Sequence, residues 1–208
     1  MSEIDHEYLS HQYLYVPWVE GLDSVSVGKA LGLYVAQQHK ARLTIVTVQK
    51  SNANFHPEFN KLSVVTERSG SVQDGGVVLA WCPTYKVMEK VHHLTKSIVV
   101  LVEWPTTQFE GWAKLVGAYN IVTGAVMESG LSEAGTKALE GIVWEGYNGW
   151  HDDIARRLTL KRLQELAAGD GYDRELVLAY ARREKSDYAI ENLVKILNTF
   201  DTSLTATK

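Results

Sequence analysis

Short apolar runs alternate with helical patterns over the first 123 residues of the chain. The apolar runs have the length and composition of buried β-strands, and they lie at residues 13–19, 42–49, 62–67, 77–81, 97–103 and 119–122. Apolar residues recur three and four positions apart, as on one face of a helix, at residues 24–40, 84–94 and 106–117. Strands that alternate with covering helices are typical of a parallel sheet buried on both faces. The pattern therefore predicts an α/β fold, Rossmann-like, with a mainly parallel sheet of five or six strands.

One phrase occurs twice in this region. Residues 77–84 read Val-Val-Leu-Ala-Trp-Cys-Pro-Thr, and residues 99–106 read Val-Val-Leu-Val-Glu-Trp-Pro-Thr. Each copy is an apolar run followed by a Trp, a Pro and then a Thr at which a helix is expected to begin. The repeat predicts two successive strand–helix units that lie side by side in one parallel sheet.

The strand pattern stops after about Gly124, and helical patterns fill the rest of the chain. They cover residues 132–144, 150–168, 173–183 and 186–200. We expect Gly169 to follow the end of a helix, and Asp173 and Ser186 to cap the next two helices. The predicted organisation is a loose N-terminal tail (1–12), a Rossmann-like α/β domain (13–123) and an all-helical C-terminal region (124–208). This helical region could form a separate lobe or cover one face of the sheet.

Composition and charge narrow the class of protein. The chain has 208 residues and a formal net charge of −4, so its overall charge does not attract nucleic acid or an anionic membrane. Its one cysteine excludes an internal disulfide bond, which fits a reducing cytoplasm. The N-terminus lacks the basic and apolar regions of a signal peptide, and no apolar run reaches the roughly 18 residues that a membrane helix needs. We expect a cytoplasmic protein without a membrane partner.

The ends of the strands are the predicted site, because ligands of open α/β sheets bind where strands end and helices begin. We expect the first strand to be central, with its end about 5 Å from the end of strand 77–81. Trp rings stack on planar ligands and helix N-termini attract anions, so we predict a site for a small planar or anionic ligand. The predicted site residues are Trp18, Glu20, Asp23, Ser24, Trp81, Thr84, Glu103, Trp104 and Thr106. In the alternative interpretation, Pro and Thr only end strands and cap helices, and the Trp rings fill the ends of the core.

Other motifs fit established chemistry poorly. Residues 21–30 follow a strand as a phosphate-binding P-loop does, but six residues separate the two glycines, and Ala30 replaces the hydroxyl that binds the metal. Cys82 has no second cysteine near it and is interpreted as structural. Asp152 and Asp153 follow His151, but an acidic pair also suits the first turn of a helix. We predict no metal site and no cofactor.

Basic residues gather at two places in the helical region, and they offer a second kind of partner. The first group is Arg156, Arg157, Lys161 and Arg162, and the second is Arg182, Arg183 and Lys185. Together with a helix–turn–helix-like spacing they could contact nucleic acid. The pairs Asp153–Arg157 and Lys161–Glu165 are spaced for ion pairs along a helix, which favours a solvated face instead.

The second half of the chain carries a set of short shared phrases. A valine-rich strand ends in Trp-Pro at residues 99–105, and Gly111-Trp112-Ala113, Gly117-Ala118-Tyr119-Asn120, Asn148-Gly149 and Leu/Arg-rich helices ending near Leu197 follow. With these features residues 99–200 resemble a loose group of uncharacterised actinobacterial and phage-related proteins of unknown function. The resemblance implies a bacterial cytoplasmic or phage-related origin, and it implies no catalytic residues.

Three functions remain open at this point. The leading hypothesis is a non-catalytic binding or interaction protein with its site at the carboxyl edge of the sheet, because no complete catalytic set of residues is present. The second is an enzyme that acts on a nucleotide or phosphorylated metabolite, with Glu20 or Glu103 as general base. The third is nucleic-acid binding by the C-terminal helices. Six Trp and ten Tyr could also supply an exposed aromatic patch for a homodimer.

Overall fold

The computed structural model describes residues 7–206, and the chain divides into two compact units, residues 1–128 and 129–208. Part of the predicted loose tail, residues 1–6, lies outside the described residues. The rest of that tail is ordered against the sheet domain. Residues Glu7–Ser10 form a short 3-10 helix (η1), and the Gln12 side chain donates to the carbonyl of Thr95 at 2.9 Å.

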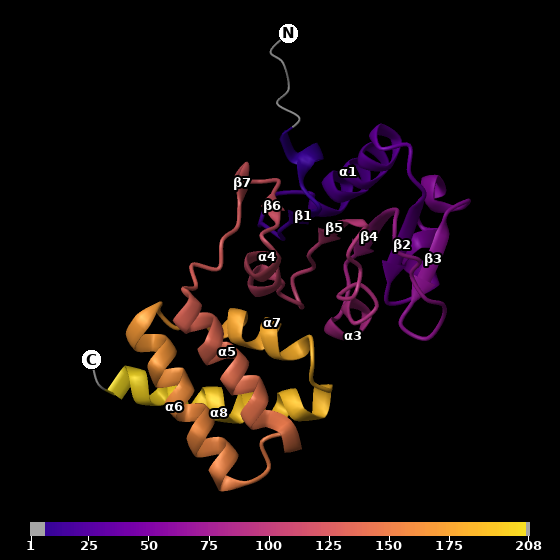
Figure 1. Ribbon diagram of the computed structural model, residues 1–208. Coiled ribbons are helices and arrows are strands. Elements are labelled where there is room, and N and C mark those ends of the chain that lie inside the picture. Colours follow the sequence, from indigo (N-terminus) through magenta and orange to yellow (C-terminus); the bar gives the residue numbers. More distant parts are fainter. Residues whose placement is uncertain (1–6, 207–208) are drawn as a thin grey trace. The chain divides into compact units, whose positions relative to one another are not determined.

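The first unit is built on a seven-stranded sheet in the order β3-β2-β4-β5-β1-β6-β7 (Figure 1). The strands are β1 (Tyr13–Val16), β2 (Leu43–Thr47), β3 (Ser63–Thr66), β4 (Val77–Trp81), β5 (Ile98–Val102), β6 (Tyr119–Asn120) and β7 (Ala125–Val126). All neighbours pair in parallel except β7, which pairs antiparallel with β6. The predicted α/β, Rossmann-like architecture is confirmed. The sheet has one strand more than predicted, because β7 is only two residues long and leaves no pattern in the sequence.

The predicted order of the central strands is wrong. β5 lies between β4 and β1 and is the middle strand, so the end of β1 is not the neighbour of the end of β4. The helix after β1 crosses over both β5 and β4 before the chain enters β2, and the length of a helix does not reveal how many strands it crosses. The apolar run of β5 suits the centre of the sheet, because a middle strand is buried on both faces.

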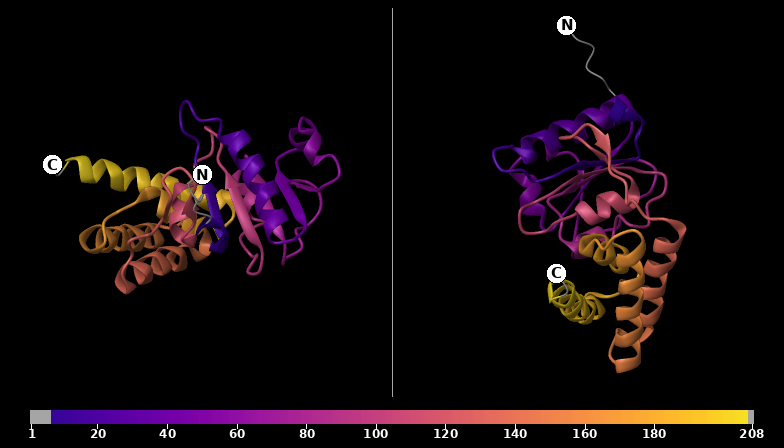
Figure 2. Two further views of the ribbon diagram at one scale, coloured as in Figure 1. Left: turned by 90° about the horizontal axis from the view of Figure 1, so that it is seen from above. Right: turned by 90° about the vertical axis from the view of Figure 1, so that its left-hand side faces the viewer.

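Helices cover both faces of this sheet. Helix α1 (Ser24–Gln38) packs on one face, where its Leu31 and Val35 form one core with Leu79 and Val100. Helices α3 (Tyr85–Met88) and α4 (Glu110–Val116) lie on the other face (Figures 1 and 2). There the ring of Trp112 meets that of Tyr13 edge-on, with 5.9 Å between their centroids.

The repeated phrase does form two adjacent strands, but they pair one residue out of step. Val78 is the partner of Val99, whereas the repeat aligns Val77 with Val99. Because side chains alternate between the faces of a strand, a shift of one residue places matching residues of the two copies on opposite faces. Trp81 and its counterpart in the repeat, Glu103, therefore belong to different sides of the sheet.

The two copies also begin their helices differently. Thr84 caps α3, since its Oγ1 accepts a hydrogen bond from the N–H of Val87 at 3.4 Å, but this helix has only four residues. Thr106 does not begin a helix. It lies in a turn in which the N–H of Thr107 donates to the carbonyl of Trp104 at 3.0 Å, and α4 begins later, at Glu110. Pro105 occupies the second turn position, which proline favours.

The second unit contains the four predicted helices. They are α5 (Glu133–Glu145), α6 (Asp153–Gly169), α7 (Arg174–Arg182) and α8 (Asp187–Ala206), with a 3-10 turn, η3 (Gly146–Asn148), between α5 and α6. Asp173 caps α7 as predicted, accepting from the N–H of Glu175 and Leu176. Gly169 is the last residue of α6 rather than the residue after it, and Gly171 adopts the left-handed conformation, with φ +87°.

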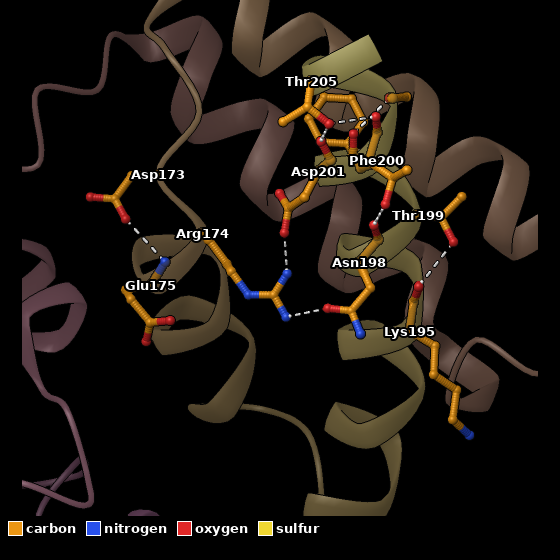
Figure 3. Close-up of polar contacts among 11 residues, drawn as sticks. Asp173, Arg174, Glu175, Lys195, Asn198, Thr199, Phe200, Asp201 and Thr205 are labelled. Atoms are coloured by element: carbon orange, nitrogen blue, oxygen red, sulfur yellow. Dashed lines mark hydrogen bonds and ion pairs between the residues drawn. The ribbon is translucent and has the colours of Figure 1, made fainter.

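Arg174 joins α7 to α8. Its guanidinium donates to the carboxylate of Asp201 and, at 2.8 Å, to Oδ1 of Asn198, which lies one helical turn before Asp201 (Figure 3). The planar guanidinium can bond two acceptors at once, a geometry that the single ammonium of lysine does not reproduce.

Asp74 joins the loops that precede β4 and β5. Its carboxylate accepts hydrogen bonds from the Ser97 hydroxyl at 2.7 Å and from the backbone N–H groups of Gly75, Thr95 and Lys96 at 3.0–3.2 Å. The Ser97 bond, followed by the backbone bonds, holds the pKa of Asp74 well below its ordinary value.

Asp74→Asn is therefore expected to lower the free energy of unfolding at neutral pH, by an amount that shrinks in acid. A carboxylate whose pKa falls on folding stabilises the folded state above its unfolded pKa of about 3.9. That contribution is lost as the pH falls from this value toward the folded pKa. Urea denaturation of both proteins at about pH 7 and about pH 3 measures the difference. Asp153→Asn, at an exposed carboxylate, is the control, and a pH-independent effect of Asp74→Asn would contradict the assignment.

Candidate functional site

Two cavities open at the edge where the parallel strands end, and each has a volume of about 490 Å3. We call the first the Trp104 cavity. Its lining residues are Val25, Val48, Asn52, Phe55, His56, Trp81, Cys82, Pro83, Thr84, Trp104, Thr106 and Thr107. We call the second the Glu103 cavity. Its lining residues are Tyr15, Pro17, Trp18, Glu103, Gln108, Glu110, Asn120, Thr123 and Met127.

The cavities belong to opposite faces of the sheet. Trp81 is part of the core on the face that α1 covers, as is Val102. Glu103 follows Val102 directly and so points to the opposite face. Tyr15 also faces that side, because it alternates with Leu14 and Val16 of the α1 core. The alternation of side chains thus divides the predicted single site into two.

Aromatic rings dominate the Trp104 cavity. Trp81 is 3% exposed and is met edge-on by His56 at 5.2 Å and by Phe59 at 5.3 Å between centroids. These two residues come from the segment after β2, which contains α2 (Lys50–Asn54) and the 3-10 turn η2 (Pro57–Phe59). Phe55 and Trp104 are 80% and 46% exposed. One fixed indole and two accessible aromatic side chains give surfaces against which a planar ring can stack.

A sharp bend at the end of β4 shapes this cavity. Cys82 has a left-handed backbone with φ +46°, which is uncommon for a residue other than glycine, and its N–H donates to the carbonyl of Val102 at 3.0 Å. Burial raises the pKa of the Cys82 thiol to about 11. The thiol is therefore protonated at neutral pH and is a poor nucleophile, in keeping with the structural role predicted for it.

Most polar groups around the Trp104 cavity carry no charge. The described residues that line it include no Asp, Glu, Lys or Arg. Asn52 supplies an amide that donates to the hydroxyl of Thr47 at 3.4 Å, and Thr106 and Thr107 supply hydroxyl groups. Such groups can orient a ligand by hydrogen bonds, but they cannot neutralise a charge.

The Glu103 cavity is built around a buried carboxylate. Glu103 is 7% exposed, and its two oxygens accept hydrogen bonds from the backbone N–H of Trp18 at 3.0 Å and of Phe109 at 2.5 Å. It thereby joins the loop after β1 to the loop before α4. Burial raises the pKa of Tyr15, and the charge of the neighbouring Glu103 and the hydrogen bond between the two side chains raise it further. The hypothesis that Glu103 acts as a general base stays a prediction.

The helix N-termini at this edge are occupied by the protein's own groups. Asp23 accepts the N–H of Ser26 at 3.0 Å at the start of α1, and hydrogen bonds from the side chain and then the backbone of Ser26 lower the pKa of Asp23. Thr84 caps α3, and Glu103 accepts the N–H of Phe109 just before α4. An anionic ligand would have to compete with two carboxylates at these positions. Of the two predicted kinds of ligand, planar and anionic, these helix N-termini therefore do not favour the anionic one.

The predicted site residues separate into three groups. Trp81, Thr84, Trp104 and Thr106 line the Trp104 cavity, and Trp18 and Glu103 line the Glu103 cavity. The others line neither of these cavities. Asp23 caps α1, Ser24 is buried and donates to the carbonyl of Pro17 at 2.7 Å, and Glu20 is exposed.

Sequence reasoning missed the segment after β2, which brings Asn52, Phe55 and His56 to the Trp104 cavity. The sequence held two indications of this segment. Strand β2 ends at the same edge as β4, and Phe55-His56-Pro57 places an aromatic ring and a histidine in an otherwise polar loop. Sequence reasoning also missed Asn120, the last residue of β6, which lies at the same edge. Its Oδ1 accepts hydrogen bonds from the N–H groups of Val122 and Thr123. The two-residue length of β6 concealed that position.

The basic residues of the helical unit are partly paired with acids. Arg156 pairs with Asp153 at 3.6 Å, in place of the predicted Asp153–Arg157 pair. Glu165 pairs with Lys161 at 3.9 Å and with Arg162 at 3.0 Å. These exposed pairs are each worth little, and nucleic-acid binding by this face stays a prediction.

Neither a cluster of metal ligands nor a membrane-spanning helix is found in residues 7–206. No group of three or more His, Cys, Asp and Glu side chains is arranged to hold a metal ion in this part of the chain. Of the helices described there, none combines the length and the apolar character needed to cross a membrane. The homodimer and the cytoplasmic location stay predictions.

Comparison with known proteins adds no assignment to this geometry. No family model matches the chain. No curated protein matches it, and no solved structure does.

Proposed function

We propose that this chain is a non-catalytic binding protein whose ligand, an uncharged planar molecule, occupies the Trp104 cavity. One observation carries the proposal: buried Trp81 and exposed Phe55 and Trp104 surround a cavity of about 490 Å3 at the carboxyl edge of a parallel sheet. Ligand pockets of proteins commonly have about 300–1,000 Å3, apolar walls and a few polar groups. The edge itself is where open α/β sheets bind their ligands.

The lining of the cavity favours one kind of ligand. Trp104 and Phe55 favour a flat ring, since stacked aromatic pairs are worth about 0.5–1.5 kcal/mol beyond the burial of their area. A charged group would be partly desolvated in the cavity, which is costly, and no Asp, Glu, Lys or Arg among the described lining residues offers it a counter-ion. The hydroxyl groups of Thr106 and Thr107 and the amide of Asn52 fit a ring that carries a carbonyl or ring nitrogen.

A thermal-shift screen of uncharged planar heteroaromatic fragments, followed by calorimetric titration of the hits, tests this proposal. A fragment of about ten non-hydrogen atoms is expected to bind with a Kd in the millimolar range, at about −4 kcal/mol. Trp104→Ala removes one stacking surface and is expected to weaken binding about fivefold.

Trp144→Ala is the matched control, because Trp144 is an exposed tryptophan of the helical unit. Its replacement should leave fragment binding unchanged. Equal weakening by both substitutions, or a screen in which none of the uncharged planar fragments binds, would contradict the proposal.

A further inference from the structure

The Glu103 carboxylate is buried without a counter-ion. Its residue is 7% exposed, and its hydrogen-bond partners are the backbone N–H groups of Trp18 and Phe109 and the hydroxyl of Tyr15, which are all neutral. None of the described Lys, Arg and His side chains forms an ion pair with it. A buried charge is usually paired, because an isolated one loses its hydration without recovering the cost. The wall of the Glu103 cavity thus holds a negative charge that a cation could neutralise.

A second carboxylate strengthens this negative field. Glu110 also lines the cavity, and its charge, like that of Glu103, acts on the hydroxyl of Tyr15. Glu110 is exposed and pairs with Lys114 at 2.8 Å, so the negative charge of Glu110 is partly neutralised already. Glu103 is therefore the main charge, and Glu110 supports it near the opening.

The other walls of the cavity suit an organic cation rather than a bare ion. Trp18, 44% exposed, presents an indole ring, and Tyr15 and Met127 add an aromatic ring and a thioether. Aromatic faces attract ammonium groups, most strongly those of tryptophan. A small metal ion would need several oxygen ligands at once, and no group of three or more His, Cys, Asp and Glu side chains in the described residues is arranged to hold one.

We propose that the Glu103 cavity is a second binding site, independent of the Trp104 cavity, and that it takes a primary ammonium group on an aromatic body. The ammonium group bonds Glu103, with Glu110 beside it, and the ring stacks against Trp18. The cavity of about 490 Å3 has room for such an arylalkylamine.

Calorimetric titration with benzylamine tests the site, with benzyl alcohol as its uncharged counterpart of the same shape. Benzylamine is expected to bind saturably, and benzyl alcohol at least about tenfold more weakly, since a hydrogen-bonded charge is worth more than a neutral group. Added salt should weaken the binding of benzylamine only. Equal affinity for both compounds, or no saturable binding of benzylamine, would overturn the proposal, as would saturable binding of Mg2+ in its place.

Substitutions locate the binding. Glu103→Gln is expected to weaken benzylamine about tenfold. Because this substitution also disturbs a buried contact, Trp18→Leu and Glu110→Gln, at exposed positions, are tested beside it and should each weaken binding about threefold.

Glu20→Gln is the matched control. It removes the same charge from the exposed loop after β1, on a residue that lines neither cavity. An effect as large as that of Glu110→Gln would show general electrostatic attraction and overturn the site. Trp104→Ala should leave the affinity for benzylamine unchanged. The two proposed sites are therefore tested independently, and absence of binding at one does not contradict binding at the other.

Discussion

Trp150→Ala is expected to lower the free energy of unfolding of the helical unit by about 3–5 kcal/mol, the usual range for removing a buried tryptophan. Trp150 is 0% exposed, and its indole N–H donates to the buried hydroxyl of Thr159 at 3.0 Å. The ring lies directly against Gly146, where an added Cβ would come within 2.3 Å of it. Truncation therefore leaves a cavity and an unpaired hydroxyl together.

Urea denaturation followed by circular dichroism measures this loss. Trp150→Phe should fall between the unchanged protein and Trp150→Ala, because it keeps a ring but leaves the Thr159 hydroxyl without its donor, at about 1–3 kcal/mol. Trp144→Ala, at a side chain that is 77% exposed, should stay within about 0.5 kcal/mol of the unchanged protein. A Trp150→Ala protein as stable as Trp144→Ala would contradict this role.

Gly28→Ala is expected to destabilise the sheet unit by about 1–3 kcal/mol, although the same change normally stabilises the interior of a helix by about 1 kcal/mol. Gly28 lies where α1 crosses β5, and an added Cβ would come within 2.1 Å of one methyl group of Val102 and 3.1 Å of the other. Valine cannot swing both methyl groups away, because its side chain branches at Cβ. The helix must therefore move off the middle strand.

Gly169→Ala is expected to have the opposite effect on the free energy of unfolding in the same protein. Gly169 is exposed at the end of α6, and an added Cβ there would have no neighbour within 4 Å. This variant should be as stable as the unchanged protein or more stable by about 0.5–1 kcal/mol. The urea denaturation midpoints of the two variants measure these changes in stability. A stabilised Gly28→Ala protein would contradict the close packing of α1 on β5.

The sequence predicts the elements of this fold better than their order. Apolar runs and helical spacing predict β1 to β6 and the four C-terminal helices near their observed positions. They do so because an element buried on one face carries apolar residues at a regular interval, and a strand buried on both faces carries a continuous apolar run. The position of β5 between β4 and β1 depends on how far α1 crosses the sheet, which no local pattern records.

The same distinction applies to the candidate site. The prediction that strand ends carry Trp18, Trp81 and Trp104 to one edge rests on the polarity of parallel strands, and the structure places cavities there. What the sequence could not provide is the one-residue offset between β4 and β5, which sends Trp81 and Glu103 to opposite faces. Register is a property of paired strands, so it is not visible in either strand alone.

Binding of an uncharged planar ligand in the Trp104 cavity is tested most directly by one NMR titration that follows the indole N–H resonances of the six tryptophans. On addition of quinoxaline, an uncharged planar bicycle, or of a tighter fragment from the screen, the resonances of Trp81 and Trp104 are expected to shift and saturate together. Trp144 and Trp150, in the helical unit, should not move. If Trp81 and Trp104 stay in place, or shift no more than Trp144, the Trp104 cavity is not the binding site.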